Sequence, residues 1–257
     1  MSTHRRYLPA LPMALAALSL GVAAPASWAQ VPVEFEDAEV FFELNNTDGD
    51  LGIHSLVDGG PWRKMEINAP DGRNMLDIRT RSLLLRQELT ELFFESAEPT
   101  FDEVSPTKFF NRFPEGEYEI NGENAAGDLF ASTSEVTHVM PAPPVMNISG
   151  VPAAENCDVD PLPVVPKPIV IGWDEVTMSH PDLGTTNVPI EVDGYQVVVE
   201  RELEPDLTIS VDLNPDAPTK LRIPNGLIES GDELKFEVLV REASGNQTAA
   251  ESCFVVE

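Results

Sequence analysis

Apolar and polar residues alternate in several runs of the chain, most clearly at 90–95, 195–200 and 234–240, and this pattern predicts a β protein. Successive side chains of a strand point to opposite faces of a sheet, so a period of two residues marks a half-buried strand. A single short helix is predicted after Ser105, which suits the N-cap, with Pro106 at the first helical position. The runs that predict strands in the first half are 38–44, 51–57, 62–68, 74–79, 90–95, 117–121 and 129–138.

Turns separate these runs about every ten residues, as in the Asp48-Gly49 and Asp71-Gly72 steps. Asp-Gly tolerates the positive φ that tight hairpins need. Such spacing is typical of an all-β sandwich, so residues 31–140 are expected to form an Ig-like or jelly-roll domain. The segment Phe113-Pro114-Glu115-Gly116-Glu117-Tyr118 also resembles the turn that enters a late strand of Ig-like modules.

Proline marks the middle of the chain. Eight prolines lie between Pro141 and Pro168. Proline donates no backbone hydrogen bond and fixes φ, so this stretch cannot be a helix or a central strand. Residues 141–164 are therefore expected to form an extended linker between two tandem β-sandwich domains.

The second half, residues 165–257, resembles a fibronectin type III domain. The run ending Gly172-Trp173 resembles its second strand, whose tryptophan lies between the sheets, and the run from Gly194-Tyr195 resembles its third. Residues 236–246 resemble the sixth strand and the loop after it. Leu234 stands where the family usually has a tyrosine that bonds back to the backbone. The resemblance implies an all-β sandwich.

The first 29 residues are typical of a cleaved export signal. Arg5 and Arg6 precede an apolar stretch that closes on Ser27-Trp28-Ala29. Removing 1–29 takes away two basic residues and no acidic ones, so the net charge of −28 becomes about −30. This charge disfavours nucleic acid and anionic membranes as partners, and no later segment predicts a membrane span. A secreted or periplasmic location is expected.

Two cysteines, Cys157 and Cys253, occur in the chain, and in an exported protein such a pair predicts one disulfide. The fibronectin type III resemblance implies that Cys157 begins the first strand of that domain and that Cys253 lies in its last strand. These two strands lie near each other in such a sandwich.

Candidate chemistry is sparse. None of His54, His138 and His180 belongs to a catalytic or metal motif; the first two are expected to be structural and the third solvated. Oxygen-bearing residues around Gly49 suggest calcium as the one candidate cofactor, although the EF-hand order fails and a plain Asp-Gly hairpin is the favoured explanation. The candidate calcium ligands are Asn46, Asp48, Asp50 and Asp58.

Two features are candidates for binding. Trp62 follows a Gly-Gly-Pro turn and could stack on a sugar or a partner, although a place in the core at the start of a strand is favoured. Ser244 and Asn246 lie in a polar loop at one end of the second domain, where such modules often present partners. The resulting expectation is a non-catalytic binding or adhesion protein with a protein or glycan partner at a cell surface. The alternatives are an accessory component of an extracellular hydrolytic system and an enzyme with an unrecognised site in the first domain.

Overall fold

The computed structural model describes residues 31–201 and 206–257, and the expected export signal lies outside these ranges. The described chain is mostly β, as the alternation predicts. The first half contains β1 (Asp37–Asn45), β2 (Asp50–Trp62), β3 (Lys64–Asn68), β4 (Asn74–Arg79), α1 (Leu84–Gln87), β5 (Leu89–Glu95), α2 (Pro106–Arg112), β6 (Gly116–Glu123) and β7 (Leu129–Val136).

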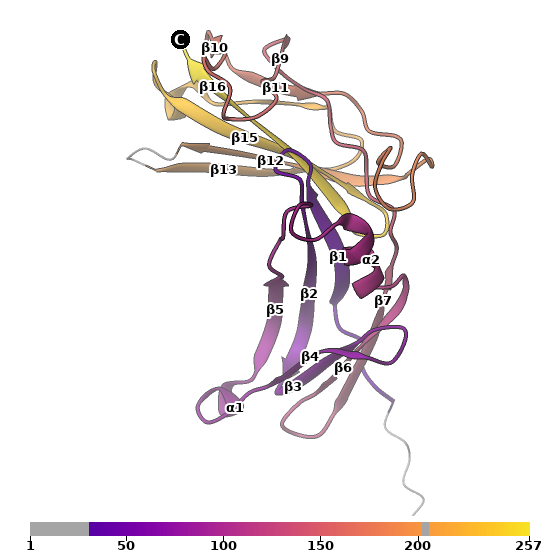
Figure 1. Cartoon of the computed structure of the whole chain (residues 1–257). Helices are drawn as coiled ribbons and strands as arrows, with labels where there is room; N and C mark the ends of the chain where they lie inside the picture. Colours follow the sequence, from indigo (N-terminus) through magenta and orange to yellow (C-terminus); the bar gives the residue numbers. More distant parts are fainter. Residues whose placement is uncertain (1–30, 202–205) are drawn as a thin grey trace, which may run out of the picture. The chain divides into compact units, whose positions relative to one another are not determined.

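The second half contains strands and one short 3-10 helix, η1 (Asn225–Leu227). In Figure 1 the colours run from indigo at β1 to yellow at β16. The strands are β8 (Met146–Ile148), β9 (Val151–Pro152), β10 (Val164–Val165), β11 (Val170–Trp173), β12 (Val192–Arg201), β13 (Leu207–Leu213), β14 (Lys220–Arg222), β15 (Glu233–Glu242) and β16 (Gln247–Val256).

The two halves repeat one strand order. In the first repeat, β1–β7, the first, second and fifth strands are neighbours (β1-β2-β5), and the other strands follow the order β4-β3-β6-β7. The second repeat has seven main strands, β8 and β11–β16. Its first, second and fifth strands are again neighbours (β8-β11-β14), and the others follow the order β13-β12-β15-β16. Each repeat therefore pairs a three-stranded set with a four-stranded set around its own core.

Both cores place a tryptophan at the same point of the topology. Trp62 ends β2 and Trp173 ends β11, the second strand of each repeat, and both rings are buried. Trp62 packs in a cluster that includes Phe42 and Tyr118, whereas Trp173 packs with Tyr195 at a ring-centroid distance of 5.4 Å. The expectation for Trp173 as a core residue is confirmed.

The sixth strand is fixed differently in the two repeats. Tyr118, in β6, donates its hydroxyl hydrogen to the carbonyl of Pro114 at 3.2 Å. This contact has the form of a tyrosine corner, in which a tyrosine at the start of the sixth strand bonds back to the chain before it. Leu234 lies at the start of β15 in the second repeat, fully buried and without a hydroxyl.

The helix before β6 begins as expected, with Ser105 as N-cap and Pro106 in its first turn. The Ser105 side chain makes no capping hydrogen bond, so Pro106 and the buried faces of Phe109 and Phe110 stabilise the helix instead. Phe42 packs against both rings, at centroid distances of 6.0 and 5.4 Å.

The repeats share one sheet. β1 pairs in parallel with β16 through Glu43↔Gln247, Leu44↔Thr248 and Asn45↔Ala249. This pairing joins the three-stranded set of the first repeat to the four-stranded set of the second. The resulting sheet has eight strands in the order β13-β12-β15-β16-β1-β2-β5, with β10 also on β16.

The proline-rich segment 141–164 differs from an unpaired linker. β8 lies in it and pairs antiparallel with β11, and β10 pairs with β16. Cys157 lies in a turn between β9 and β10 and not at the start of a strand, and it forms a disulfide with Cys253 in β16. The predicted disulfide is confirmed. Within the described ranges, no helix has the length and apolar character of a membrane span.

Candidate functional site: an acidic cleft beside His54

The alternation of β1 separates its two faces. Val40, Phe42 and Leu44 are buried in the first core, so Phe41 and Glu43 point to the opposite face of the sheet, here called the outer face. The β1–β2 register places His54 opposite Phe41 and Gly52 opposite Glu43. Directly paired residues share a face, so the strand pairing brings His54 and Glu43 together on the outer face.

The outer face is hollowed by a cleft of about 500 Å³ to which both repeats contribute. Carboxylates dominate its polar lining, and among the described residues Arg241 is the one arginine or lysine there. The Arg241 guanidinium pairs with Glu39 and lies over the Phe41 ring, 5.4 Å from its centroid. The acidic cleft, as it is called below, is lined by Glu43, Glu95, Asp193, Asp212 and Glu237, together with His54, Phe93, Leu239 and Gln247.

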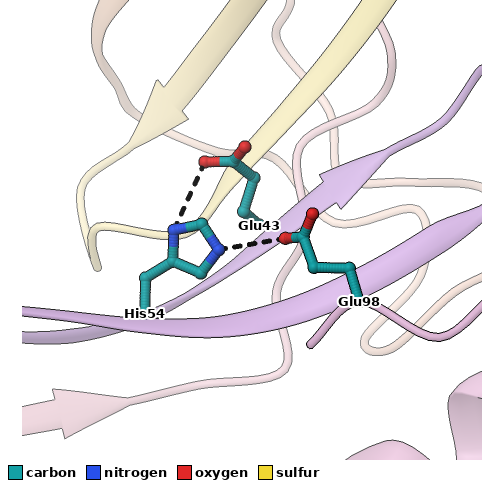
Figure 2. Close-up of side chains that lie close together, drawn as sticks. All are labelled: Glu43, His54 and Glu98. Atoms are coloured by element: carbon teal, nitrogen blue, oxygen red, sulfur yellow. Dashed lines mark hydrogen bonds and ion pairs between the residues drawn. The ribbon is translucent and has the colours of Figure 1, made fainter. Parts of the chain in front are cut away.

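His54 lies between two carboxylates (Figure 2). Its Nε2 is 3.0 Å from Glu98 Oε1, a hydrogen-bond distance, and its Nδ1 is 3.6 Å from Glu43 Oε2, which is longer than a hydrogen bond. The imidazole is 2% exposed. Among the described residues, these three form a group whose ligand-type atoms all lie within 4.8 Å of one another.

Glu98 reaches this position from a segment without regular structure that follows β5. Backbone hydrogen bonds hold the segment against β2 and the turn before it, from Ser96 N–H to the Ile53 carbonyl at 3.1 Å and from Phe101 N–H to the Gly49 carbonyl at 2.8 Å. Gly52 then leaves room for the carboxylate, because a Cβ at Gly52 would lie 2.3 Å from Glu98 Oε1. A glycine is therefore required at position 52 for Glu98 to reach His54.

Burial and like charge both act on the carboxylates of the cleft. Burial raises the pKa of Glu43, while His54 and a hydrogen bond from Gln247 lower it. Burial, followed by the charges of Glu43 and Glu251, raises the pKa of Glu237 to about 7. An added positive charge in the cleft would relieve this repulsion, so the geometry favours cationic occupants.

The predicted calcium ligands do not all come together. Asn46 and Asp48 lie in the β1–β2 turn, but Asp58 lies eight residues along β2 from Asp50, about 25 Å at the usual rise of a strand. Asn46 Oδ1 contacts His180 Nε2 at 3.0 Å, and Asp48 accepts a hydrogen bond from Asn45. Calcium binding by the turn therefore stays a prediction for Asp48 and Asp50, without Asp58.

Asp50 is the unusual member of that turn. Its Oδ1 is buried and has no hydrogen-bond partner among the described residues. Burial, then the charges of Glu98 and Asp48, raises its pKa to about 6. The turn thus adds to the negative charge beside Glu98.

Trp62 is not available to a ligand. Its side chain is 0% exposed and lies in the first hydrophobic core. Trp62 is the last residue of β2, so of the two alternatives the core position is observed and stacking on a partner is excluded.

Ser244 and Asn246 are also engaged within the chain. Asn246 is 1% exposed; its Oδ1 accepts from the Phe42 N–H at 2.8 Å, and its Nδ2 donates to the carbonyls of Thr137 and Val139, each at 3.0 Å. Ser244 contacts the Thr137 hydroxyl at 2.9 Å. The loop expected to present a partner instead holds the second repeat against the first.

The other histidines have structural positions. His138 contacts the Phe113 carbonyl through Nε2 at 2.8 Å and packs against Phe110. His180 is buried and not solvated as expected: its Nδ1 accepts from the Asp182 N–H, so its Nε2 carries the hydrogen that Asn46 Oδ1 accepts. Burial lowers the pKa of His180.

Sequence reasoning placed His54 among structural residues and did not select Glu43 or Glu98. The register of the hairpin alone would have placed His54 and Glu43 on the same face of the sheet, because the Asp-Gly turn fixes which residues of the two strands lie opposite each other. No sequence signal points to Glu98, which reaches His54 from an irregular segment 44 residues away.

No protein-family model matches the chain, and no curated protein matches it. Among solved structures, the chain is similar to the FN1–FN3 domains of chicken CNTN1, with 11% identity, a TM-score of 0.35, and coverage of 89% of this chain and 66% of that one. It is also similar to a tetra-tandem repeat in the extending region of a large adhesion protein, with 8% identity, a TM-score of 0.28, and coverage of 86% and 50%. Both alignments span less than two thirds of the other chain.

Proposed function

We propose that the chain is an exported, non-catalytic binding or adhesion protein built from two fibronectin type III-like repeats. The observation that carries this proposal is the strand order, which is the same in both repeats and divides each into a three-stranded and a four-stranded set. Such two-layer sandwiches are common in cell-surface domains. The Tyr118 corner of the first repeat and the buried Trp173 of the second support the assignment.

The partner binds in the acidic cleft. The side chain of Asn246 is buried and used by contacts within the chain, so it is not available to a second molecule. The cleft, in contrast, is open on the outer face of the shared sheet and is lined mainly by carboxylates. A chain with a net charge of −28 attracts cationic surfaces over a distance of about a Debye length. The partner is therefore a protein segment rich in lysine or arginine at a cell surface.

Binding to arrays of peptides and glycans tests the proposal, with two charge-matched double variants. Asp193→Asn with Asp212→Asn removes two charges from the cleft. Glu117→Gln with Glu119→Gln removes two exposed charges from β6, on another sheet. We expect binding to basic peptides that weakens with salt and falls about tenfold or more in the cleft variant, with no change in the β6 variant.

Equal loss of binding in both variants would mean that binding depends on the net charge of the chain, and it would contradict the proposal that the partner binds in the acidic cleft. Binding to glycans alone would favour the accessory role in a hydrolytic system. Turnover of ester, peptide or glycoside substrates by the purified chain would contradict the non-catalytic proposal.

A further inference from the structure

The pair formed by His54 and Glu43 has the geometry of two ligands on one divalent metal ion. Bonds of 2.0–2.1 Å at a tetrahedral angle separate two ligand atoms by roughly 3.3 Å. The distance from His54 Nδ1 to Glu43 Oε2 is 3.6 Å, close to this value and too long for a hydrogen bond.

Glu98 occupies the position that a supporting residue takes in many metal sites. A metal-bound histidine usually donates its other ring N–H to a carboxylate, which fixes the tautomer and the ring orientation. Here the Nε2 of His54 lies 3.0 Å from Glu98 Oε1. A hydrogen on Nε2 leaves the lone pair of Nδ1 facing Glu43.

The surroundings suit an ion with open coordination positions. His54 and Glu43 both line the acidic cleft, so water or a bound molecule can reach the remaining positions from the cleft volume of about 500 Å³. Glu95 and Glu237 line the same cleft and add negative charge around the ion. Since the one disulfide uses both cysteines of the chain, no thiolate competes for the metal.

We propose that His54 Nδ1 and Glu43 bind a zinc-like divalent ion at the edge of the acidic cleft, and that Glu98 is a positioning residue that holds His54 in the binding tautomer. An imidazole with a carboxylate suits zinc better than calcium or magnesium, which prefer oxygen ligands alone. The site is distinct from the predicted calcium turn, and it does not rest on the proposed function.

Calorimetric titration of the purified, untagged full chain with Zn²⁺ tests the site. We expect one ion per chain, weakened about a hundredfold by His54→Asn and by Glu43→Gln, while a millimolar excess of Ca²⁺ does not displace it. Glu98→Gln keeps an oxygen acceptor for Nε2–H and weakens binding by roughly tenfold. The matched control is His138→Gln, which removes another histidine that lies away from the cleft and leaves the affinity unchanged.

Nitrogen NMR of the His54 ring separates a metal site from a structural contact. In the metal-free chain we expect hydrogen on Nε2 and none on Nδ1, with zinc shifting the Nδ1 resonance. Glu98→Ala would reduce the Nε2–H population and Glu98→Gln would restore it.

A ring protonated on both nitrogens at neutral pH, unaltered by zinc, would overturn the proposal and make His54 a cation held between two carboxylates. Absence of binding at millimolar zinc, or full binding by a folded His54→Asn variant, would overturn it as well. Circular dichroism of each variant shows whether it is folded.

Discussion

The two repeats share a strand order but stabilise their sixth and seventh strands by different chemistry. The first repeat uses the Tyr118 corner and has no disulfide, whereas the second has Leu234 at the start of β15 and a disulfide from Cys157 to Cys253. A hydroxyl-to-carbonyl hydrogen bond contributes about 1 kcal/mol, and a disulfide closing a long loop contributes several. The same topology can therefore be stabilised by covalent or by noncovalent contacts, and substitutions can measure each.

The largest effect is expected from the disulfide. It closes a loop with a sequence separation of 96, so replacing Cys157 and Cys253 by serine should lower the free energy of unfolding by about 4 kcal/mol. Urea unfolding followed by tryptophan fluorescence measures this loss. Variants that keep only Trp62 or only Trp173 report one repeat each, because each ring is buried in its own core.

The loss should be concentrated in the repeat that contains Trp173. Equal losses at both reporters would mean that the shared sheet makes the chain unfold as one unit, and would remove the contrast between the repeats.

The second effect concerns the contact between the repeats. Asn246→Ala removes the side-chain partners of the Phe42 N–H and of the Thr137 and Val139 carbonyls, and should cost about 3 kcal/mol. We expect the unfolding transitions reported by Trp62 and Trp173 to occur at different urea concentrations.

Asn111→Ala, at an exposed position of α2, is the control and should change the free energy of unfolding by less than about 0.5 kcal/mol. Coincident transitions in the Asn246 variant would show that β1–β16 pairing alone couples the repeats.

The third effect runs in the opposite direction. Burial raises the pKa of Glu237 from its ordinary value of 4.5 to about 7, so the folded chain holds this proton more tightly than the unfolded chain. The contribution of Glu237 to the free energy of unfolding is therefore greatest below pH 4.5 and falls as the pH rises to about 7. Glu237→Gln should raise the free energy of unfolding by about 1–3 kcal/mol at pH 8 and have little effect at pH 4. Thermal unfolding across this range measures the difference, with exposed Glu233→Gln as the control.

The smallest effect isolates the corner of the first repeat. Tyr118→Phe removes the hydroxyl that bonds to the Pro114 carbonyl and should cost about 1 kcal/mol, seen at Trp62 and not at Trp173. If both tryptophans report a lower free energy of unfolding, or if neither does, the tyrosine corner does not distinguish the repeats.

The sequence predicted the elements well because their signals are local. Alternation, the Asp-Gly turns and the Ser105-Pro106 step identified most strands and the helix α2, and the even pair of cysteines identified the disulfide. The β1–β16 pairing joins residues about 200 positions apart and leaves no periodic signal.

The same limit applies to the candidate sites. Asn246 looks like an exposed loop residue until the first repeat is placed against it, and Glu98 approaches His54 only because Gly52 has no side chain. The burial of Asn246 and the approach of Glu98 to His54 both depend on contacts between distant segments of the chain. The local sequence pattern carries no signal for such contacts.

The parallel pairing of β1 with β16 has a mechanical consequence. The paired residues lie at the end of β1 and the start of β16, and both strands run in the same direction. Tension applied between the beginning of β1 and the end of β16 would slide the strands along each other, loading their evenly spaced hydrogen bonds together and not one after another. Strands loaded in this shear geometry separate at a higher force than strands that are peeled apart. We therefore expect the β1–β16 pairing to bear force if the chain links two surfaces.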